Sequence, residues 1–176
     1  LKEFEIISNK IAPYAKLVYL HKWGEPLMNK NIIKMITMTS KYAHPHISTN
    51  GILMDRKRAE DLITSGLGTL IISIDGITQN VYEKYRIGGQ VKTVMDNIKM
   101  LKEINNYYSN PVKILPQFIV FDHNYDELEE FRLFCKNLEL TPIFKKPYIR
   151  FGSVKESKDK NYQREKFSTE EEHLQA

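Results

Sequence analysis

Cysteine is nearly absent from this sequence, and long apolar runs are absent altogether. Cys135 is the only cysteine among 176 residues, which excludes an internal disulfide and any metal site built from several thiolates of this chain. No run approaches the roughly eighteen apolar residues of a membrane-spanning helix, so we expect no membrane association. There is no long block of like charges, and with a formal net charge of +4 nothing argues for a nucleic-acid partner.

An initiator Met, a signal-peptide pattern, internal repeats and low-complexity segments are missing too. The chain opens instead on LKEFEIISNKI, whose Phe4, Ile7 and Ile11 lie at the spacing of one helix face. A chain that opens in the middle of a helix looks like a piece of something longer. We therefore expect a fragment of a cytoplasmic protein.

The composition is that of a compact globular domain, with 41% apolar and 27% charged residues. Short apolar runs predict strands at 17–20, 44–49, 69–75, 112–121 and 141–151. Amphipathic stretches predict helices at 29–40, 55–65 and 80–104, and a further one after 124. Asp55 is a suitable N-cap, Asn124 and Glu127 fit a capping box, and two prolines interrupt the last strand. The alternation indicates a parallel α/β fold, either an open sheet or part of a (β/α) barrel.

Polar residues gather where four of these strands end. The clusters are Gly24–Glu25, Thr49–Gly51, Ser73–Gly76 and Asp122–Asn124. Parallel α/β folds bind ligands at the carboxyl ends of their strands. Four polar clusters at equivalent ends therefore predict a binding site there.

Two of these clusters place carboxylates at strand ends. In ISIDG, Ser73 and Asp75 share a strand face, and nucleotide-binding folds use such a carboxylate to hold the hydroxyls of a ribose. Asp75 is equally suited to capping a helix or turn with Gly76. In WGEP, Gly24 permits close approach of a ligand, and the following proline extends Glu25, whose carboxylate suits an ammonium group. The alternative for Glu25 is a solvent-exposed turn.

The other candidate groups also admit a structural interpretation. Arg86, in YEKYRIGG, suits a bidentate pair with a carboxylate or a surface position beside Glu83. Asn50 precedes Gly51 and needs no ligand in such a turn. The histidines lack the spacing of metal ligands, so we interpret His21, His44, His46 and His123 as structural. Cys135 falls on the inward stripe of a helix and is interpreted as core.

Taken in order, several short motifs resemble the core of radical S-adenosylmethionine (radical SAM) enzymes, particularly the branch with a SPASM or similar C-terminal extension. The motifs are WGEPL, STNG, ISIDG, YEKYRIGG and FIVFDHN, spread over roughly residues 1 to 150. Each motif alone is common. Their order and their placement at strand ends make the combination specific.

The resemblance implies roles for individual positions. The Gly-Gly-Glu-Pro motif of the family binds the methionyl amine of S-adenosylmethionine, which implies that role for Gly24 and Glu25, although Trp23 replaces the first glycine. The Ser-x-Asp motif of the family contacts the ribose hydroxyls, which implies that role for Ser73 and Asp75. The resemblance further implies that Arg86 pairs with the methionyl carboxylate and that Asn50 and Gln117 line the same pocket.

The family's [4Fe-4S] cluster, on a Cys-x3-Cys-x2-Cys loop, has no counterpart here, and the cysteines of the extension are missing too. The resemblance thus implies residues 1–151 as an incomplete core of about five of six strands, and residues 152–176 as a polar linker. The intact enzyme would use an electron donor to cleave S-adenosylmethionine, and its 5′-deoxyadenosyl radical would abstract hydrogen from an unknown peptide or small-molecule substrate. This chain alone should be inert in that reaction.

Two other interpretations remain open. The missing cysteines favour a cluster-free α/β module that binds a nucleotide or a protein. A barrel lyase or hydrolase with Glu25 and Asp75 as acid and base would be active without iron, but no lysine or histidine has a clear role in it. A Cys-x3-Cys-x2-Cys motif encoded about 20–30 residues upstream would favour the radical SAM interpretation over the module.

Overall fold

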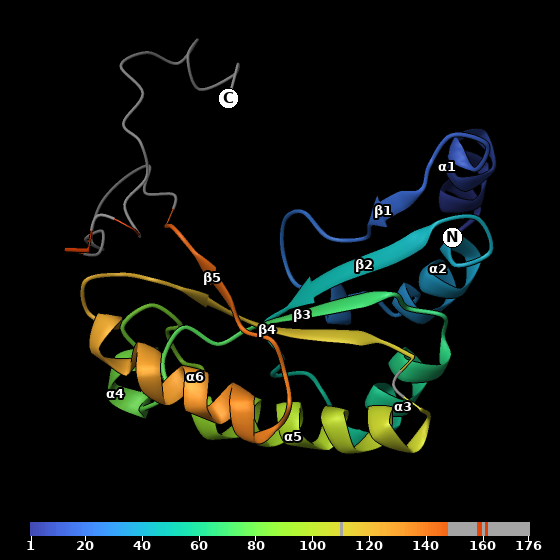
Figure 1. Cartoon of the computed structure of the whole chain (residues 1–176). Coiled ribbons are helices and arrows are strands. Elements are labelled where there is room, and N and C mark those ends of the chain that lie inside the picture. The colour runs from blue at the N-terminus through green and yellow to red at the C-terminus, as the bar shows by residue number, and fades with distance from the viewer. Residues whose placement is uncertain (110, 148–157, 160, 162–176) are drawn as a thin grey trace, which may run out of the picture.

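Five parallel strands form a single sheet in the computed structural model, which describes residues 1–109, 111–147, 158–159 and 161 (Figure 1). The strands lie in sequence order, β1-β2-β3-β4-β5, and every neighbouring pair is parallel. Their bounds are Leu17–Tyr19 (β1), His44–Thr49 (β2), Thr69–Ser73 (β3), Lys113–Ile119 (β4) and Ile143–Lys145 (β5). Sequential parallel order is the arrangement of a (β/α) barrel wall, so the predicted fold class is confirmed.

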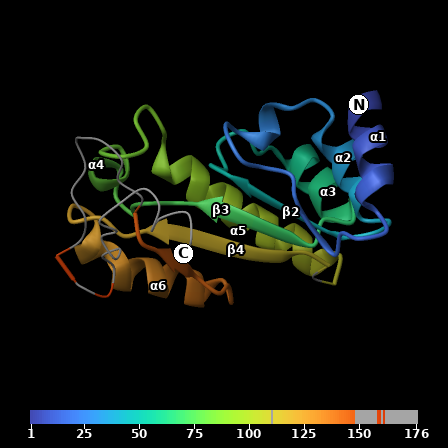
Figure 2. The same cartoon turned by 90° about the horizontal axis from the view of Figure 1, so that it is seen from above.

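Helices connect the strands and cover one face of the sheet. The α-helices are Lys2–Ile11 (α1), Ile32–Thr39 (α2), Arg56–Thr64 (α3), Gln79–Tyr82 (α4), Val91–Tyr107 (α5) and Leu128–Asn137 (α6). Two 3₁₀ turns, η1 (Pro26–Met28) and η2 (Tyr125–Glu127), begin the segments that follow β1 and β4. In Figure 1, α3, α5 and α6 lie beneath the sheet. Figure 2 shows α1, α2 and α3 together near the end where β2, β3 and β4 begin, so the opposite end carries the strand carboxyl termini.

The main core lies between the sheet and these helices. Ile47, Ile72 and Phe118 point from successive strands into a cluster of buried apolar side chains, and the predicted stripe of α5 joins it through residues such as Val94 and Ile98. All five residues of β3 are buried, so this strand is covered on both faces. At about 25 cal/mol per Å² of apolar surface, this buried layer is the main favourable contribution to folding.

Alternation along the strands places a second set of side chains on the face away from this core, here called the inner face. Its members in register are Ser48, Ile71 and Leu115 in one row, and Ser73 and Gln117 in the next. Ile71 and Leu115 are buried but do not belong to the core cluster beneath the sheet. The inner face therefore combines apolar residues with a pair of polar side chains near the carboxyl ends of β3 and β4.

The single helix predicted over 80–104 was wrong, because the structure divides it into α4 and α5. Gly88, in the loop between the two helices, has φ +73, a left-handed conformation that a continuous helix does not allow. The Gln79 side chain spans the interruption, since its Nε2 donates to the Gly89 carbonyl at 2.9 Å and its Oε1 accepts from the Val91 amide at 3.0 Å. Arg86 consequently lies on a loop at the rim of the sheet.

The predicted capping box of α6 was also wrong. Asn124 accepts a hydrogen bond from the Phe121 amide at 2.7 Å instead of capping the helix. The Glu127 carboxylate reaches the loop after β3, where it accepts from the Ile77 amide at 2.5 Å, the Thr78 amide at 3.1 Å and the Thr78 hydroxyl at 2.5 Å. Asn124 thus binds a donor in the loop just before it, Glu127 binds donors in the loop after β3, and neither side chain caps α6.

Other predictions were confirmed in part. Asp55 caps α3 through the Arg58 amide at 2.7 Å, as expected. α1 forms as predicted, but Ile7 is 56% exposed, so its apolar face is only partly covered. The strand predicted over 141–151 is confirmed for its three residues in β5, whereas 148–151 and the proposed linker of 152–176 fall almost entirely outside the described residues. Within the described part, no helix has the length and apolar character needed to cross a membrane.

Candidate functional site

The Glu25 carboxylate is held at the carboxyl end of β2 by three hydrogen bonds from described residues. Its Oε1 accepts from the Leu27 amide at 3.0 Å and the Thr49 hydroxyl at 2.6 Å, and its Oε2 accepts from the Asn50 amide at 2.8 Å. A carboxylate has about four lone-pair positions. Because Glu25 is only partly buried, its fixed carboxylate retains capacity for a ligand donor.

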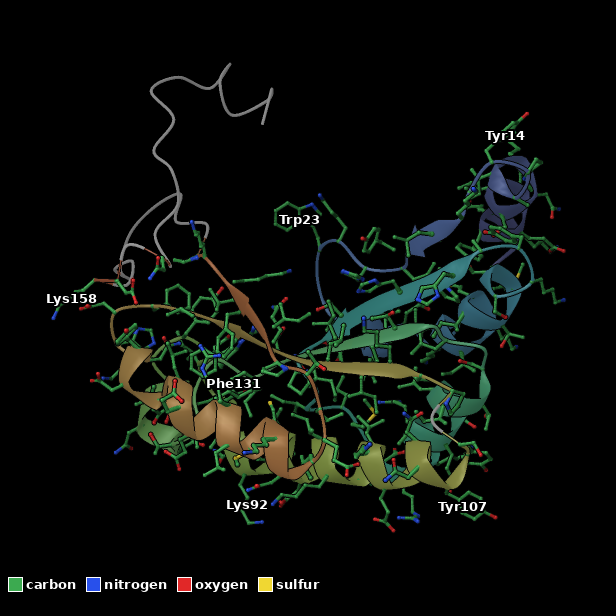
Figure 3. The ribbon with its side chains drawn as sticks, in the orientation of Figure 1. Tyr14, Trp23, Lys92, Tyr107, Phe131 and Lys158 are labelled. Atoms are coloured by element: carbon green, nitrogen blue, oxygen red, sulfur yellow. The ribbon has the colours of Figure 1, made fainter. Side chains whose placement is uncertain are left out.

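The loop that carries Glu25 has the backbone that its sequence predicts. Gly24 has φ +81, and no atom lies within 4 Å of the place where a Cβ would stand, so a ligand can approach this backbone. Glu25 precedes Pro26 and is extended, with φ −111° and ψ 114°. Trp23 is 92% exposed at this loop and points away from the sheet (Figure 3).

Asp75 is completely buried just beyond β3, and both of its carboxylate oxygens have partners. The Oδ2 atom accepts from Nε of Arg86 at 2.7 Å and from Nη2 at 2.5 Å, while Oδ1 accepts from the Ile119 amide at 2.6 Å. Burial raises the pKa of Asp75, and the Arg86 guanidinium and the Ile119 amide oppose that shift. The Arg86 side chain is 24% exposed, and the pair uses two of its five N–H donors.

Asn124 fixes the backbone around this ion pair. Its Nδ2 donates to the carbonyl oxygens of Asp75 and Ile119, each at 2.9 Å, and its side chain is fully buried. The loop after β3 and the end of β4 are therefore joined through one amide. Sequence reasoning placed Asn124 at a strand end but gave it a capping role.

Ser73 and Gln117 face one another across β3 and β4. Their Cα atoms are register partners, and Nε2 of Gln117 donates to the Ser73 hydroxyl oxygen at 3.3 Å. Both residues are buried, with exposures of 6% and 5%. Oε1 of Gln117 has no hydrogen-bond partner among the described residues, which leaves a buried acceptor unsatisfied.

The described rim is hollowed in two places. A cavity of about 310 Å³ lies between Asn50 and the loop of Tyr85 and Arg86. A second, of about 540 Å³, lies beside β1 and is lined by Glu25 and Trp23 among others. Glu25 therefore lines the larger cavity directly, and its hydrogen bond to the Asn50 amide connects it to the smaller one.

The predicted residues thus form connected pairs along the strand ends. These are Glu25 with Asn50, Asn50 with Arg86 across the smaller cavity, Arg86 with Asp75, and Ser73 with Gln117. The structure shows no hydrogen bond between Ser73 and Asp75 among the described residues. Thr49, which sequence reasoning named without a role, anchors Glu25, and its hydroxyl at the end of the predicted strand was the available signal.

Three aromatic side chains gather at β1, at β2 and just beyond the end of β1. The ring of His46 lies 4.8 Å from that of Tyr19 and 5.5 Å from that of His21, between centroids, and Nδ1 of His21 lies 3.3 Å from the His46 carbonyl oxygen. Burial, together with electrostatic repulsion from the neighbouring side chains of His21, His44 and Lys145, lowers the pKa of His46 to about 4. The His46 ring is therefore neutral near pH 7 and packs against its aromatic neighbours, while its Nε2 has no hydrogen-bond partner among the described residues.

Cys135 is fully buried on α6, facing inward as predicted, and burial raises the pKa of its thiol to about 12. A neutral, buried thiol is a poor metal ligand. In the part of the chain that the structure describes, no three His, Cys, Asp or Glu side chains lie close enough to hold a metal ion together.

Comparison with known proteins gives a family and several relatives. Residues 4–135 match the model of the Radical SAM superfamily. A probable GTP 3′,8-cyclase of Archaeoglobus fulgidus is 30% identical over 146 residues, which cover 76% of this chain and 48% of that protein. The GTP 3′,8-cyclase of Thermodesulfovibrio yellowstonii is 31% identical over 119 residues, which cover 66% of this chain and 35% of the relative. The chain spans less than half the length of these curated relatives.

Solved structures share the fold. Streptococcus suis SuiB bound to S-adenosylmethionine gives a TM-score of 0.70 at 16% identity, covering 90% of this chain and 36% of SuiB. The protein anSMEcpe with bound AdoMet and the Cp18Cys peptide gives 0.68 at 14% identity, covering 93% of this chain and 47% of that one. The likeness to these structures concerns the fold, and the family model covers most of the sequence. The chain belongs to the radical SAM superfamily.

Proposed function

We propose that this chain forms the S-adenosylmethionine-binding part of a radical SAM enzyme. The observation that supports it best is the Glu25 carboxylate, which three hydrogen bonds hold at the strand ends while it keeps capacity for another donor. An ammonium group is the natural partner of such an oriented carboxylate. Gly24 next to it leaves space for close approach.

The remaining groups fit the other parts of S-adenosylmethionine. Arg86 is oriented by Asp75 and keeps donors for the methionyl carboxylate. Ser73 and Gln117 present polar atoms on the inner face for the ribose. Asn50 lines the cavity beside Arg86.

The donor set of this chain does not fit an iron–sulfur cluster. A [4Fe-4S] centre needs several thiolates, and the one cysteine of the sequence is buried in the core. Any cluster of the whole protein must therefore take its ligands from outside this sequence. S-adenosylmethionine, when bound beside a reduced cluster, supplies a 5′-deoxyadenosyl group for hydrogen abstraction.

The branch, the cellular location, the partner and the substrate of the whole protein are also proposals. We place the whole protein in the SPASM-type branch, in the cytoplasm, with an electron donor as partner and a peptide or small molecule as substrate. The solved neighbours support a peptide, because one is a complex of SuiB with its precursor peptide SuiA. The curated relatives, named for GTP, support a small molecule.

The test is binding of S-adenosylmethionine and S-adenosylhomocysteine to the purified chain. Trp23, the single tryptophan, lies two residues before Glu25 and provides a fluorescence signal beside the site. We expect saturable binding, weakened about tenfold or more in Glu25→Gln because a charge-assisted hydrogen bond is lost. Glu5→Gln, at an exposed position of α1, is the matched control and should bind like the unaltered chain. Calorimetry that detects neither ligand would overturn the proposal.

The single cysteine also favours a second candidate, a cluster-free module that binds a nucleotide. Both candidates predict binding of an adenosyl ligand. They differ in what the gene must encode, because only the enzyme requires a Cys-x3-Cys-x2-Cys motif in the coding sequence upstream. Sequencing that region distinguishes them, and absence of the motif would exclude the enzyme.

A further inference from the structure

Three aromatic rings form a cluster on the inner face, at the β1 edge of the sheet. Tyr19 and His46 are register partners on β1 and β2, and their ring centroids lie 4.8 Å apart. The ring of His21 lies 5.6 Å from that of Tyr19 and 5.5 Å from that of His46. His46 alternates along β2 with Ile47, which belongs to the core beneath the sheet, so this ring cluster stands on the opposite face.

The ring cluster is open to a ligand. Tyr19 is 59% exposed, and Tyr19, His21 and Trp23 line the cavity of about 540 Å³. Sites for small molecules have volumes of roughly 300–1,000 Å³. In Figure 3, Trp23 lies on the side of the sheet away from the helices beneath it, and no ring among the described residues packs against it. Exposed aromatic side chains around a cavity are typical of a recognition site.

The two histidines offer nitrogen atoms to a ligand but no positive charge. Because a carbonyl oxygen only accepts, Nδ1 of His21, 3.3 Å from the His46 carbonyl oxygen, carries the hydrogen, which leaves its Nε2 as an acceptor. Nε2 of His46 has no hydrogen-bond partner among the described residues. Burial lowers the pKa of both rings, so they are neutral near pH 7. Such groups match the ring nitrogens and exocyclic groups of a heterocycle better than an anion.

Positive charge faces the ring cluster from the opposite edge of the sheet. Lys145 on β5 is the register partner of Ile119, which follows Gln117 by two residues, so it stands on the inner face. It is exposed and has no ion pair among the described residues. Its ammonium adds to the lowering of the pKa of His21 and His46, which indicates that it lies near them. Figure 1 shows the outer strands β1 and β5 rising on the side away from the helices, so the inner face is concave.

Building on the proposed function, we propose that the concave inner face beside β1 binds the substrate of the whole protein as a nitrogen heterocycle that carries an anionic group. The heterocycle lies against the ring cluster, and the anionic group pairs with the Lys145 ammonium. Lys22 also lines the cavity and favours the same sign of ligand charge. The cavity reaches Glu25, so its occupant lies beside the proposed S-adenosylmethionine site, where hydrogen abstraction requires a substrate.

The experiment is calorimetry on the whole chain with S-adenosylhomocysteine present in excess, so that the adenosyl site is filled. The probe is inosine 5′-monophosphate, which has both the heterocycle and the anion. Inosine lacks the anion, and ribose 5-phosphate lacks the heterocycle. We expect saturable binding of inosine 5′-monophosphate, about 3- to 5-fold weaker binding of inosine, and weaker binding still of ribose 5-phosphate, because each loses one set of contacts.

Two variants assign these contacts to residues. Lys145→Gln should weaken binding of inosine 5′-monophosphate about 3- to 5-fold and leave that of inosine unchanged, because only the anion loses its partner. Tyr19→Ala should weaken binding of both about 5- to 30-fold, because stacking on the heterocycle is lost. Lys41→Gln and Tyr107→Ala are the matched controls, the same changes at exposed positions outside the inner face, and should bind the probe like the unaltered chain.

If Tyr19→Ala does not fold, as judged by circular dichroism, the exposed Lys145→Gln still tests the inference. A chain that binds S-adenosylhomocysteine but not the probe, or binds the probe and inosine equally, overturns this inference and leaves the proposed function standing. Tighter binding of the dipeptide Tyr-Glu than of the probe, or self-association that Tyr19→Ala abolishes in ultracentrifugation, also overturns it, because the face then serves a peptide or a second copy. Binding of the probe without S-adenosylhomocysteine overturns the proposed function alone, and binding of neither overturns both.

Discussion

Asp75 draws its partners from three separate segments. Arg86 comes from the loop before α5, the Ile119 amide from the end of β4, and Nδ2 of Asn124, which binds the Asp75 carbonyl, from the loop beyond it. A buried carboxylate is tolerated only when its charge and lone pairs are matched in this way. Asp75 thereby connects the rim that carries Arg86 to the sheet.

Removing this carboxylate should therefore destabilise the fold. For Asp75→Ala we expect a loss of about 3–5 kcal/mol in the free energy of unfolding, because Arg86 loses its buried partner. Urea denaturation measures this value. Asp96→Ala is the matched control: Asp96 pairs with Lys92 and Lys99 on the exposed side of α5, and such pairs contribute about 1 kcal/mol at most. Equal losses in the two variants would contradict the role given to Asp75.

His46 should make stability depend on pH. Its pKa is about 4 in the fold, against about 6.5 in the unfolded chain, so the unfolded state binds more protons between these values. Stability should thus fall as the pH drops from about 6.5 towards 4. In His46→Gln we expect a shallower fall, by at most about 1.4 kcal/mol per pH unit, since the ring is partly exposed.

Denaturant titrations at several pH values measure this slope. Above about pH 7.5 the two proteins should show parallel profiles, because the imidazole is then neutral in both states. The groups that surround His46 and oppose its protonation are His21, His44 and Lys145. An unchanged slope in the variant would show that other groups dominate the acid response.

At the scale of elements, the loop after β3 is ordered by the start of α6. Glu127 is 9% exposed and accepts hydrogen bonds from the amides of Ile77 and Thr78 and from the Thr78 hydroxyl. The loop so fixed leads into α4 and then to Arg86. The position of the Arg86 loop therefore depends on the start of α6, although no residue of α6 lines either of the two cavities at the strand ends.

Glu127→Ala should cost about 2–4 kcal/mol of stability, because several donors lose their partner, although loop relaxation and water recover part of it. Thermal and urea unfolding measure the loss. Glu129→Ala, two residues along the chain, removes an 87% exposed carboxylate that pairs with Arg132 and should change stability by less than about 1 kcal/mol. A Glu127 variant as stable as this control would mean that the loop is held by other contacts.

At the scale of the whole molecule, the described strand ends carry polar groups suited to an organic ligand, and no cluster of metal-ligating side chains lies among the described residues. The single thiol is buried behind the sheet on α6, with a pKa of about 12. The groups at the strand ends are carboxylate, guanidinium, amide and hydroxyl, and under the proposed function they would recognise an organic ligand by charge and hydrogen bonding. When this chain is studied alone, we therefore expect it to bind the ligand without carrying out radical chemistry.

After anaerobic incubation with iron, sulfide and a reductant, we expect this chain to acquire no [4Fe-4S] absorption. With S-adenosylmethionine it should release neither methionine nor 5′-deoxyadenosine, because the thiolates needed for a cluster are absent. Visible absorption and chromatography measure both. Product release that is lost in Cys135→Ser would contradict this expectation.

The sequence by itself determined the order and type of most elements and the positions that meet at the strand ends. The periodicity of apolar residues and the strand-end motifs are local features of the sequence. Neighbouring residues were therefore enough to predict β2, α3 and the extended conformation of Glu25. Local pattern failed where side chains act at long range. The Asn124 and Glu127 spacing resembled a cap, yet Glu127 bonds to residues about 50 positions earlier.

Only the tertiary structure decided which polar groups remain available to a ligand. Asp75 and Gln117 are both polar residues at strand ends, but register and burial give Asp75 a full set of partners and leave Gln117 with an unsatisfied oxygen. The reason is physical: hydrogen bonds between β3, β4 and the Arg86 loop join residues 11 to 44 positions apart, and no local sequence period records them.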